Sequence, residues 1–217
     1  MTKGDDGTKD KLIATKERWA REGRLLTGAA ADPAERLPPG QHEVRNWPVL
    51  DLGVQPELTR EKWHLRVDGL VANKIAWRYA DLLAQPQTRQ ISDIHCVTSW
   101  SRYDMPFEGV SALHLLEQVQ PLPEARHLMV HSFDGYTTNL PLELFAAPDV
   151  LIAHSAEGRP LTREHGGPVR LVVPKLYFWK SAKWISRIEV LSEERLGFWE
   201  ERGYHRIGDP WTEERYS

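Results

Sequence analysis

The sequence has little cysteine, with a single residue, Cys96, in a chain of 217. One thiol excludes an intrachain disulfide and any zinc site built from four cysteines. The Cys-x-x-Cys-His motif that attaches haem is absent, as is the cysteine spacing of iron–sulfur proteins. We therefore expect no haem, and any thiol chemistry must use Cys96.

A strong net charge and a long apolar run are also missing. The 28 Lys and Arg against 31 Asp and Glu give a net charge of −3, and the basic residues form no stripe, which argues against a nucleic-acid partner. No stretch is long and apolar enough to span a membrane. The first 28 residues contain neither an apolar signal core nor a twin-arginine pair, so we expect no secretory signal and a cytoplasmic location.

The composition that remains is typical of a folded protein, with 41% hydrophobic and 27% charged residues. We expect residues 1–40 to be a charged arm, with a helix at 10–24 followed by a connector that contains prolines. Residues 41–217 are expected to form one domain that ends in an aromatic tail. Within it, short strands and short helices alternate irregularly, which predicts an α+β fold with mixed sheets.

Hydrophobic periodicity and turn residues predict the elements of this domain. Strands are expected at 63–67, 128–132, 136–140, 150–154, 171–174 and 185–191. Helices are expected at 79–85, 112–119 and 141–147, and Ser111 is a suitable N-cap for the second of them. Residues 165–168, His-Gly-Gly-Pro, are expected to be irregular because glycine and proline impose their own backbone geometry.

The stretch 91–110, ISDIHCVTSWSRYDMPFEGV, places Cys96 where a partly buried strand is expected to end and a polar loop to begin. A lone cysteine is commonly a small buried hydrophobic residue. It can also be a nucleophile or a soft metal ligand, because the thiolate does both. His95 precedes it, but neighbours on a strand point to opposite faces, which argues against a Cys–His dyad. The residues alone leave these alternatives open.

Two signatures resemble those of the sulfite oxidase family of molybdenum enzymes. The first is HCVTSWS at 95–101, in the Cys-Val-x-x-Trp-Ser form of the bacterial branch. The second is GRPLTREHGGPVRLVVPKLYFWKSAKW at 158–184, with Gly-x-Pro-Leu, His-Gly-x-Pro-Val-Arg, Val-Val-Pro and a closing Lys-Trp. The resemblance spans roughly residues 41–191. It is strongest to the small single-domain sulfite-oxidase-like proteins of bacteria and archaea.

The resemblance implies an oxidoreductase with one molybdopterin, whose molybdenum is held by the cofactor dithiolene and by the Cys96 thiolate. Tyr136 is implied to lie beside the metal, and Arg45 to attract an anionic substrate, so these residues and Cys96 form the implied catalytic set. The implied cofactor contacts are Asn46, Cys96, His165, Arg170, Lys180, Ser181 and Lys183. A pterin that carries an anionic phosphate explains why arginine and lysine are suitable here.

The reaction implied by the resemblance is oxygen-atom transfer on a small sulfur- or nitrogen-oxo substrate, with an external electron donor or acceptor. The family's Cys-Ala-Gly-Asn-Arg is replaced by Cys-Val-Thr-Ser-Trp, so an arginine that helps to bind sulfite has no counterpart. We therefore expect weak sulfite turnover. Two alternatives stay open: a metal-free thiol redox protein that uses Cys96, and a module that binds molybdopterin without turnover.

Overall fold

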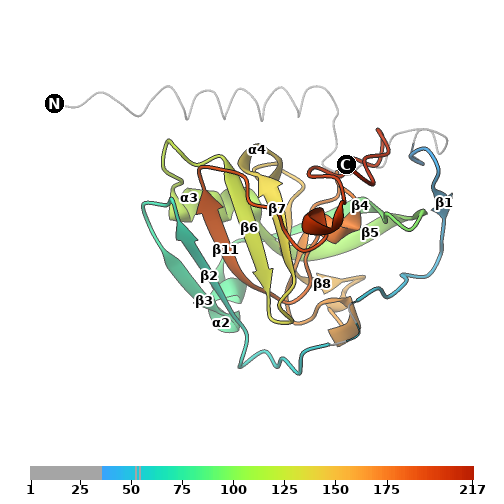
Figure 1. Ribbon diagram of the computed structural model, residues 1–217. Coiled ribbons are helices and arrows are strands. Elements are labelled where there is room, and N and C mark those ends of the chain that lie inside the picture. The colour runs from blue at the N-terminus through green and yellow to red at the C-terminus, as the bar shows by residue number, and fades with distance from the viewer. Residues whose placement is uncertain (1–35, 52, 54) are drawn as a thin grey trace, which may run out of the picture.

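The framework of the protein is a pair of mixed β-sheets (Figure 1). The computed structural model describes residues 36–217 except positions 52 and 54, so the helix expected at 10–24 lies outside the described residues. Sheet A has the order β1-β5-β8-β10, with β4 paired to β5 and β9 paired to β8. Sheet B has the order β3-β2-β11-β6-β7. Both the predicted α+β class and the mixed sheets are confirmed.

The elements follow the chain in an interleaved order. Sheet A contains β1 (His42–Glu43), β4 (Gln87–His95), β5 (Trp100–Ser111), β8 (Leu151–Ala156), β9 (Arg159–Pro160) and β10 (Arg170–Val172). Sheet B contains β2 (His64–Gly69), β3 (Ile75–Arg78), β6 (His127–Ser132), β7 (Thr137–Pro141) and β11 (Ile185–Leu191). The helices are α2 (Tyr79–Ala84), α3 (Ala112–Val119) and α4 (Leu142–Phe145), with 3-10 turns η2 (Arg163–His165), η3 (Phe178–Lys180) and η4 (Glu200–Arg202). None of the helices in this part of the chain is long and apolar enough to cross a membrane.

Sheet A is buried on both faces, which explains the apolar composition of its central strands. On β8, Ile152 belongs to the main hydrophobic cluster, whereas Leu151 and Ala153 belong to a second, smaller cluster. Successive residues of a strand point to opposite faces, so the two clusters lie on opposite sides of the sheet. Cys96 belongs to the smaller cluster, together with Phe107 of β5.

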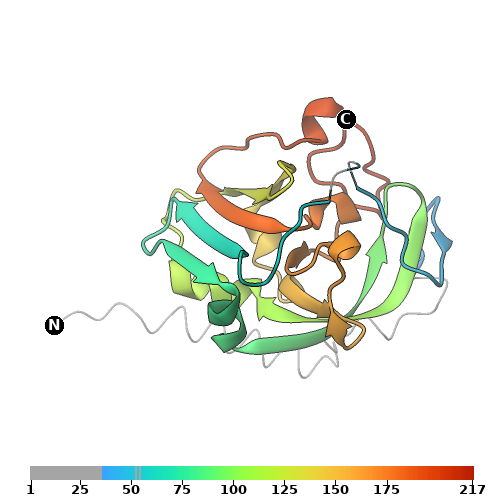
Figure 2. The same cartoon turned by 90° about the horizontal axis from the view of Figure 1, so that it is seen from below.

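The stretch after Cys96 differs from the expectation of a polar loop. Only residues 96–99 form a turn, and β5 begins at Trp100 and runs to Ser111 between β4 and β8. The prediction was wrong because polar side chains of this stretch pair with residues far away in the sequence: Arg102 pairs with Glu157, and Asp104 pairs with Arg36. Strands β4 and β5 form a long hairpin around this turn. Figure 2 shows β1 beside the turn end of the hairpin, where His42 is paired with Trp100.

The helix at 112–119 begins as the sequence predicts. The Ser111 hydroxyl accepts a hydrogen bond from the Leu113 amide at 3.2 Å, which satisfies one of the free amides of the first turn. Leu115 and Val119 face the main cluster, and Gln120 ends the helix in the left-handed region. Local chemistry was therefore sufficient to place this element.

Candidate functional site

A cavity of about 290 Å³ lies beside the Cys96 turn. Its walls come from five segments that are far apart in the sequence, within residues 47–51, 96–100, 134–136, 165–184 and 199–204. Three of these segments include residues that the sequence singled out. The cavity is therefore the place where the predicted site residues can be compared with the fold.

The Cys96 thiol is presented by a tight turn between β4 and β5. The Cys96 amide donates to the Trp100 carbonyl at 2.8 Å, and the Ser99 amide donates to the Cys96 carbonyl at 3.0 Å. Ser99 has a φ of 72°, which closes the turn. The sulfur is 3.2 Å from the Thr98 hydroxyl, and only 5% of the residue is exposed.

This environment suits a metal ligand better than a free nucleophile. Burial raises the pKa of the Cys96 thiol, although the Thr98 hydroxyl and the charge of Arg215 oppose the shift. A reactive cysteine instead needs a lowered pKa, whereas a bound metal deprotonates a coordinating thiol outright. No hydrogen bond joins His95 to Cys96 in the described residues: its Nδ1 bonds to the Ser101 hydroxyl at 2.8 Å, and burial lowers its pKa to about 4.

Tyr136 directly precedes β7 and faces the same cavity. Its hydroxyl donates to the Trp179 carbonyl at 2.7 Å, so the phenol is held in one orientation. Burial raises the pKa of Tyr136 well above its ordinary value, with the charge of Glu200 adding to the shift. The side chain is thus a fixed, protonated phenol at the cavity wall.

Two cations occupy one side of the cavity without a carboxylate within ion-pair distance among the residues described. Arg170 is 2% exposed and donates to the carbonyls of His165, Ser181 and Leu171. Burial lowers its pKa to about 9. Lys183 donates to the Glu164 carbonyl at 2.6 Å, and burial, followed by the charge of Arg170, lowers its pKa to about 8. Desolvated charge is costly unless it is paired, so this wall suits an anionic ligand.

The His-Gly-Gly-Pro loop brings His165 to the cavity. Its ring stacks on Trp47 with centroids 4.0 Å apart, and its Nε2 is 3.2 Å from the Trp47 carbonyl. Its Nδ1 is 3.0 Å from the Thr162 hydroxyl, and burial lowers the pKa of the imidazole. Gly166 follows with a φ of +97°, and its missing side chain leaves room for Lys183. Residues 166–168 form a turn, as predicted, whereas His165 ends the 3-10 turn η2; the loop packs directly against the two cations.

Three of the predicted residues are not in the cavity walls. Lys180 is fully buried and pairs with Glu200 at 2.6 Å, so its charge is neutralised inside the protein. Arg45 and Asn46 are exposed on the segment after β1. The structure gathers Cys96, Tyr136, His165, Arg170, Ser181 and Lys183 around the cavity. The roles assigned to all nine residues stay predictions.

Sequence reasoning missed the aromatic part of the walls, which includes Trp47, Phe178, Trp179, Trp199 and Tyr204. The rings form two groups: Trp47 lies 6.2 Å from Phe178, and Tyr204 lies 5.2 Å from Trp179 and 4.9 Å from Trp199, all between ring centroids. The count of nine tryptophans was a signal for it, but the sequence favoured a packing role. Their convergence depends on contacts between distant segments.

Comparison with known proteins places the cavity in a family context. The model of a family described as "Oxidoreductase molybdopterin binding domain" matches residues 52–199. An uncharacterized oxidoreductase of Bacillus subtilis (strain 168), YuiH, is 44% identical over 190 residues, covering 86% of this chain and 95% of that protein.

Larger proteins are similar over part of their length. The protein-methionine-sulfoxide reductase catalytic subunit MsrP of Pseudomonas syringae pv. tomato is 28% identical over 187 residues, with 73% of this chain and 55% of that protein covered. The crystal structure of the sulfane dehydrogenase SoxCD from Paracoccus pantotrophus superposes with a TM-score of 0.59 at 25% identity, covering 64% of this chain and 40% of that one. This chain therefore spans about half the length of MsrP, and less of the SoxCD chain.

Proposed function

Because the chain belongs to the oxidoreductase molybdopterin-binding domain family and is an oxidoreductase of that class, we propose that it transfers oxygen atoms at a molybdenum centre ligated by Cys96. The observation that carries the proposal is the cavity itself. It joins a buried thiol to two desolvated cations that no described carboxylate pairs with.

These residues fit a molybdopterin with its anionic phosphate and its metal. Arg170 and Lys183 would hold the anionic part of the cofactor, which would pair two charges that burial has separated from water. Cys96 would supply a soft thiolate ligand from a turn that is fixed by its own backbone hydrogen bonds. When bound, the cofactor supplies two-electron oxygen-atom transfer, and the protein positions the substrate and excludes water.

The proposed substrate class is a small sulfur- or nitrogen-oxo compound without a double negative charge. The name of the relative MsrP, a methionine-sulfoxide reductase, supports chemistry at an oxidised sulfur. Aromatic walls favour a neutral oxide, and Arg45 is exposed instead of lining the cavity. We propose weak sulfite turnover, electrons from an external partner, and a cytoplasmic location.

Metal analysis and visible spectroscopy test the proposal. Protein produced in a host that makes molybdopterin is expected to carry about one molybdenum per chain, and Cys96→Ser is expected to lose the thiolate-to-metal absorption band. A wild type that stays metal-free under ample cofactor supply would support the alternative of a metal-free thiol redox protein. An unchanged spectrum of the serine variant would show that Cys96 is not a ligand of the metal.

Turnover is tested with artificial electron donors and acceptors. Reduction of dimethyl sulfoxide and trimethylamine N-oxide is compared with oxidation of sulfite, for the wild type and for Arg45→Met. We expect the oxides to be reduced and sulfite to react only with a high KM. Efficient sulfite oxidation at micromolar concentrations would contradict the substrate class, and loaded protein without any turnover would indicate a binding module.

A further inference from the structure

Residues 204–216 form a closed loop beside the cavity, outside the part of the chain that the family model matches. Tyr204 and Tyr216 form an antiparallel bridge at its ends, and the His205 amide donates to the Arg215 carbonyl at 3.2 Å. Inside the loop, His205 Nδ1 accepts from the Gly208 amide at 3.2 Å. Loops whose ends meet and whose own side chains fill them are compact and frequently functional.

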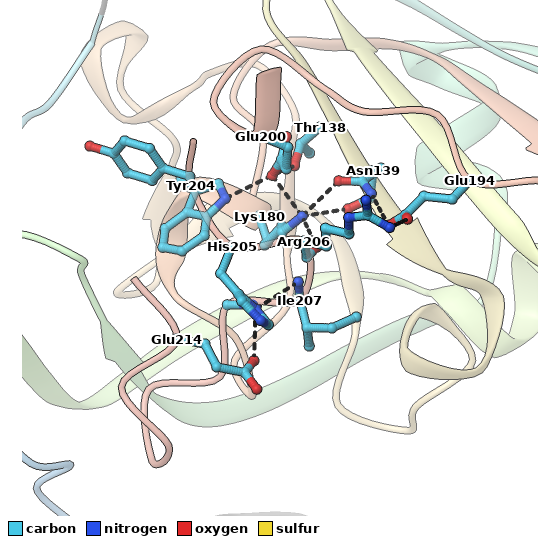
Figure 3. A network of polar contacts seen from close by, with 12 residues as sticks. Thr138, Asn139, Lys180, Glu194, Glu200, Tyr204, His205, Arg206, Ile207 and Glu214 are labelled. Atoms are coloured by element: carbon cyan, nitrogen blue, oxygen red, sulfur yellow. Dashed lines mark hydrogen bonds and ion pairs between the residues drawn. The ribbon is translucent and has the colours of Figure 1, made fainter. Parts of the chain in front are cut away.

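One anchor of this loop is a buried polar network, shown in Figure 3. The Lys180 ammonium contacts Glu200 at 2.6 Å, the Asn139 side chain at 2.8 Å and the Arg206 carbonyl at 2.5 Å. It thereby joins η3, β7, η4 and the first residues of the loop. The Trp179 indole donates to the same Glu200 carboxylate at 2.9 Å, so the network also holds a ring of the cavity wall.

The other anchors attach the loop to the Cys96 turn and to η3. Arg215 donates to the Val97 carbonyl, and to the Ser99 hydroxyl at 3.3 Å. The Tyr177 amide donates to the Gly208 carbonyl at 2.7 Å. A β-carbon on Gly208 would be 2.7 Å from the Trp179 ring, which shows how closely the loop lies against that wall. The loop is therefore held from both sides of the cavity.

Tyr204 is the residue that this loop contributes to the cavity, which it lines together with Cys96. Its ring packs between those of Trp179 and Trp199. Burial raises the pKa of Tyr204, and the neighbouring Tyr216 adds to the shift, so the phenol keeps its proton. The Tyr136 hydroxyl donates to the Trp179 carbonyl, whereas the side-chain hydrogen-bond partner of Tyr204 is Tyr216, at the other end of the same loop.

We propose that the 204–216 loop is the substrate-side wall of the active site and that Tyr204 is its specificity-determining residue. The phenol donates a hydrogen bond to the oxide oxygen of the substrate, and the ring limits the size of the group attached to the sulfur or nitrogen. The proposal rests on the proposed function, and it assigns part of the site to residues beyond the matched domain.

Steady-state kinetics of the loaded enzyme test both parts of this role. Tyr204→Phe is expected to lower kcat/KM for dimethyl sulfoxide by about three- to tenfold, mainly through KM, as loss of one neutral hydrogen bond implies. Tyr204→Ala is expected to raise the ratio of kcat/KM for methyl phenyl sulfoxide over dimethyl sulfoxide by about tenfold. The matched controls are Tyr103→Phe and Tyr103→Ala, because Tyr103 lies on β5 outside the cavity walls.

Molybdenum per chain is measured for each variant and is expected to equal that of the wild type. Unchanged kinetics and an unchanged substrate ratio in fully loaded Tyr204 variants would overturn the proposal. Selective loss of molybdenum from these variants would overturn it as well, because the loop would then hold the cofactor instead of the substrate.

A second readout does not depend on the cofactor. Cys96 is the sole thiol of the chain, so its alkylation in cofactor-free protein reports access to the cavity. Tyr204→Ala is expected to accelerate labelling by pyrenyl maleimide about tenfold more than labelling by N-ethylmaleimide, and Tyr103→Ala is not. Equal acceleration of both reagents, or none, would show that the loop is not the wall. A wild type that never takes up molybdenum would refute the proposed function, whereas the labelling experiment would still show whether the loop forms a wall of the cavity.

Discussion

Gly166 lies so close to Lys183 that a β-carbon on Gly166 would be 2.9 Å from the Lys183 β-carbon and 3.1 Å from that of Arg170. The contact links the backbone of the His-Gly-Gly-Pro loop to the two cations of the cavity. Glycine is required there for space and also for its φ of +97°, which L side chains rarely adopt. The cation pair is therefore positioned by a residue that has no side chain.

Gly166→Ala is expected to reduce both stability and cofactor loading. Gly158→Ala is the matched control, since Gly158 has a φ of +71° but a β-carbon there would meet no atom of the described residues within 4 Å. Gly158→Ala is expected to lower the free energy of unfolding by about 1–2 kcal/mol through backbone strain. Gly166→Ala is expected to lower it by about 1–3 kcal/mol more, because the added methyl group also overpacks the site. Urea denaturation and molybdenum analysis measure the two effects. Equal costs for both variants would show that the loop adapts without displacing Lys183.

Removal of each cation is expected to separate cofactor binding from folding. Lys183→Ala is expected to lower molybdenum per chain without lowering the free energy of unfolding, because the side chain makes one hydrogen bond to a carbonyl and its buried charge disfavours the cofactor-free fold. Arg170→Ala is expected to lower both, and to cost about 2–3 kcal/mol, since buried carbonyls lose their donor. Full occupancy in both variants would mean that the two residues are structural.

Lys183 is expected to make the stability of the cofactor-free chain depend on pH. Its pKa is lowered from 10.5 to about 8 in the fold, so between these values the unfolded chain binds a proton that the folded chain has released. The free energy of unfolding from this group therefore rises as pH increases from about 8 to 10.5. Urea denaturation across this range is expected to show a rise that Lys183→Met removes. An identical pH profile for the variant would rule out this titration.

The Lys180–Glu200 pair is expected to act on stability and not on cofactor loading. Lys180→Met leaves a buried carboxylate without its partner, which typically costs about 3–5 kcal/mol. The double variant Lys180→Met/Glu200→Leu is expected to recover only part of that loss, because both charges are gone but Asn139, the Arg206 carbonyl and the Trp179 indole lose their partners. Molybdenum per folded chain is expected to stay at the wild-type level. A specific loss of molybdenum in Lys180→Met would instead support the cofactor contact predicted from the sequence.

The elements that the sequence predicted well depend on local chemistry. The helix that begins at Ala112 has its cap in the preceding residue, and β11 has the predicted bounds, with a register shift between Ile185 and Arg187. The prediction failed at β5, where polar residues such as Arg102 and Asp104 pair with side chains from distant parts of the chain. A polar stretch becomes a strand when its neighbours in the fold supply ion pairs and a ladder, and neither is visible in the stretch itself.

The candidate site divides in the same way. The signatures identified the thiol, the cations and the histidine that line the cavity, because these residues lie in two short segments. Trp47 and Tyr204 were missed, since each reaches the cavity through contacts with residues far away in the sequence, such as the stack of Trp47 on His165. Aromatic rings have no local spacing that distinguishes a cavity wall from a core.

By itself the sequence determined the single thiol, the turn after His165, the Ser111 cap and the order of the two signatures. Each of these depends on residues that are close together in the chain. Only the tertiary structure decided where each charge goes. Lys180 and Lys183 are three residues apart, yet one pairs with Glu200 in the interior and the other faces the cavity. The reason is that η3 packs against β7 and η4, so the direction of each side chain is set by what lies next to it in space.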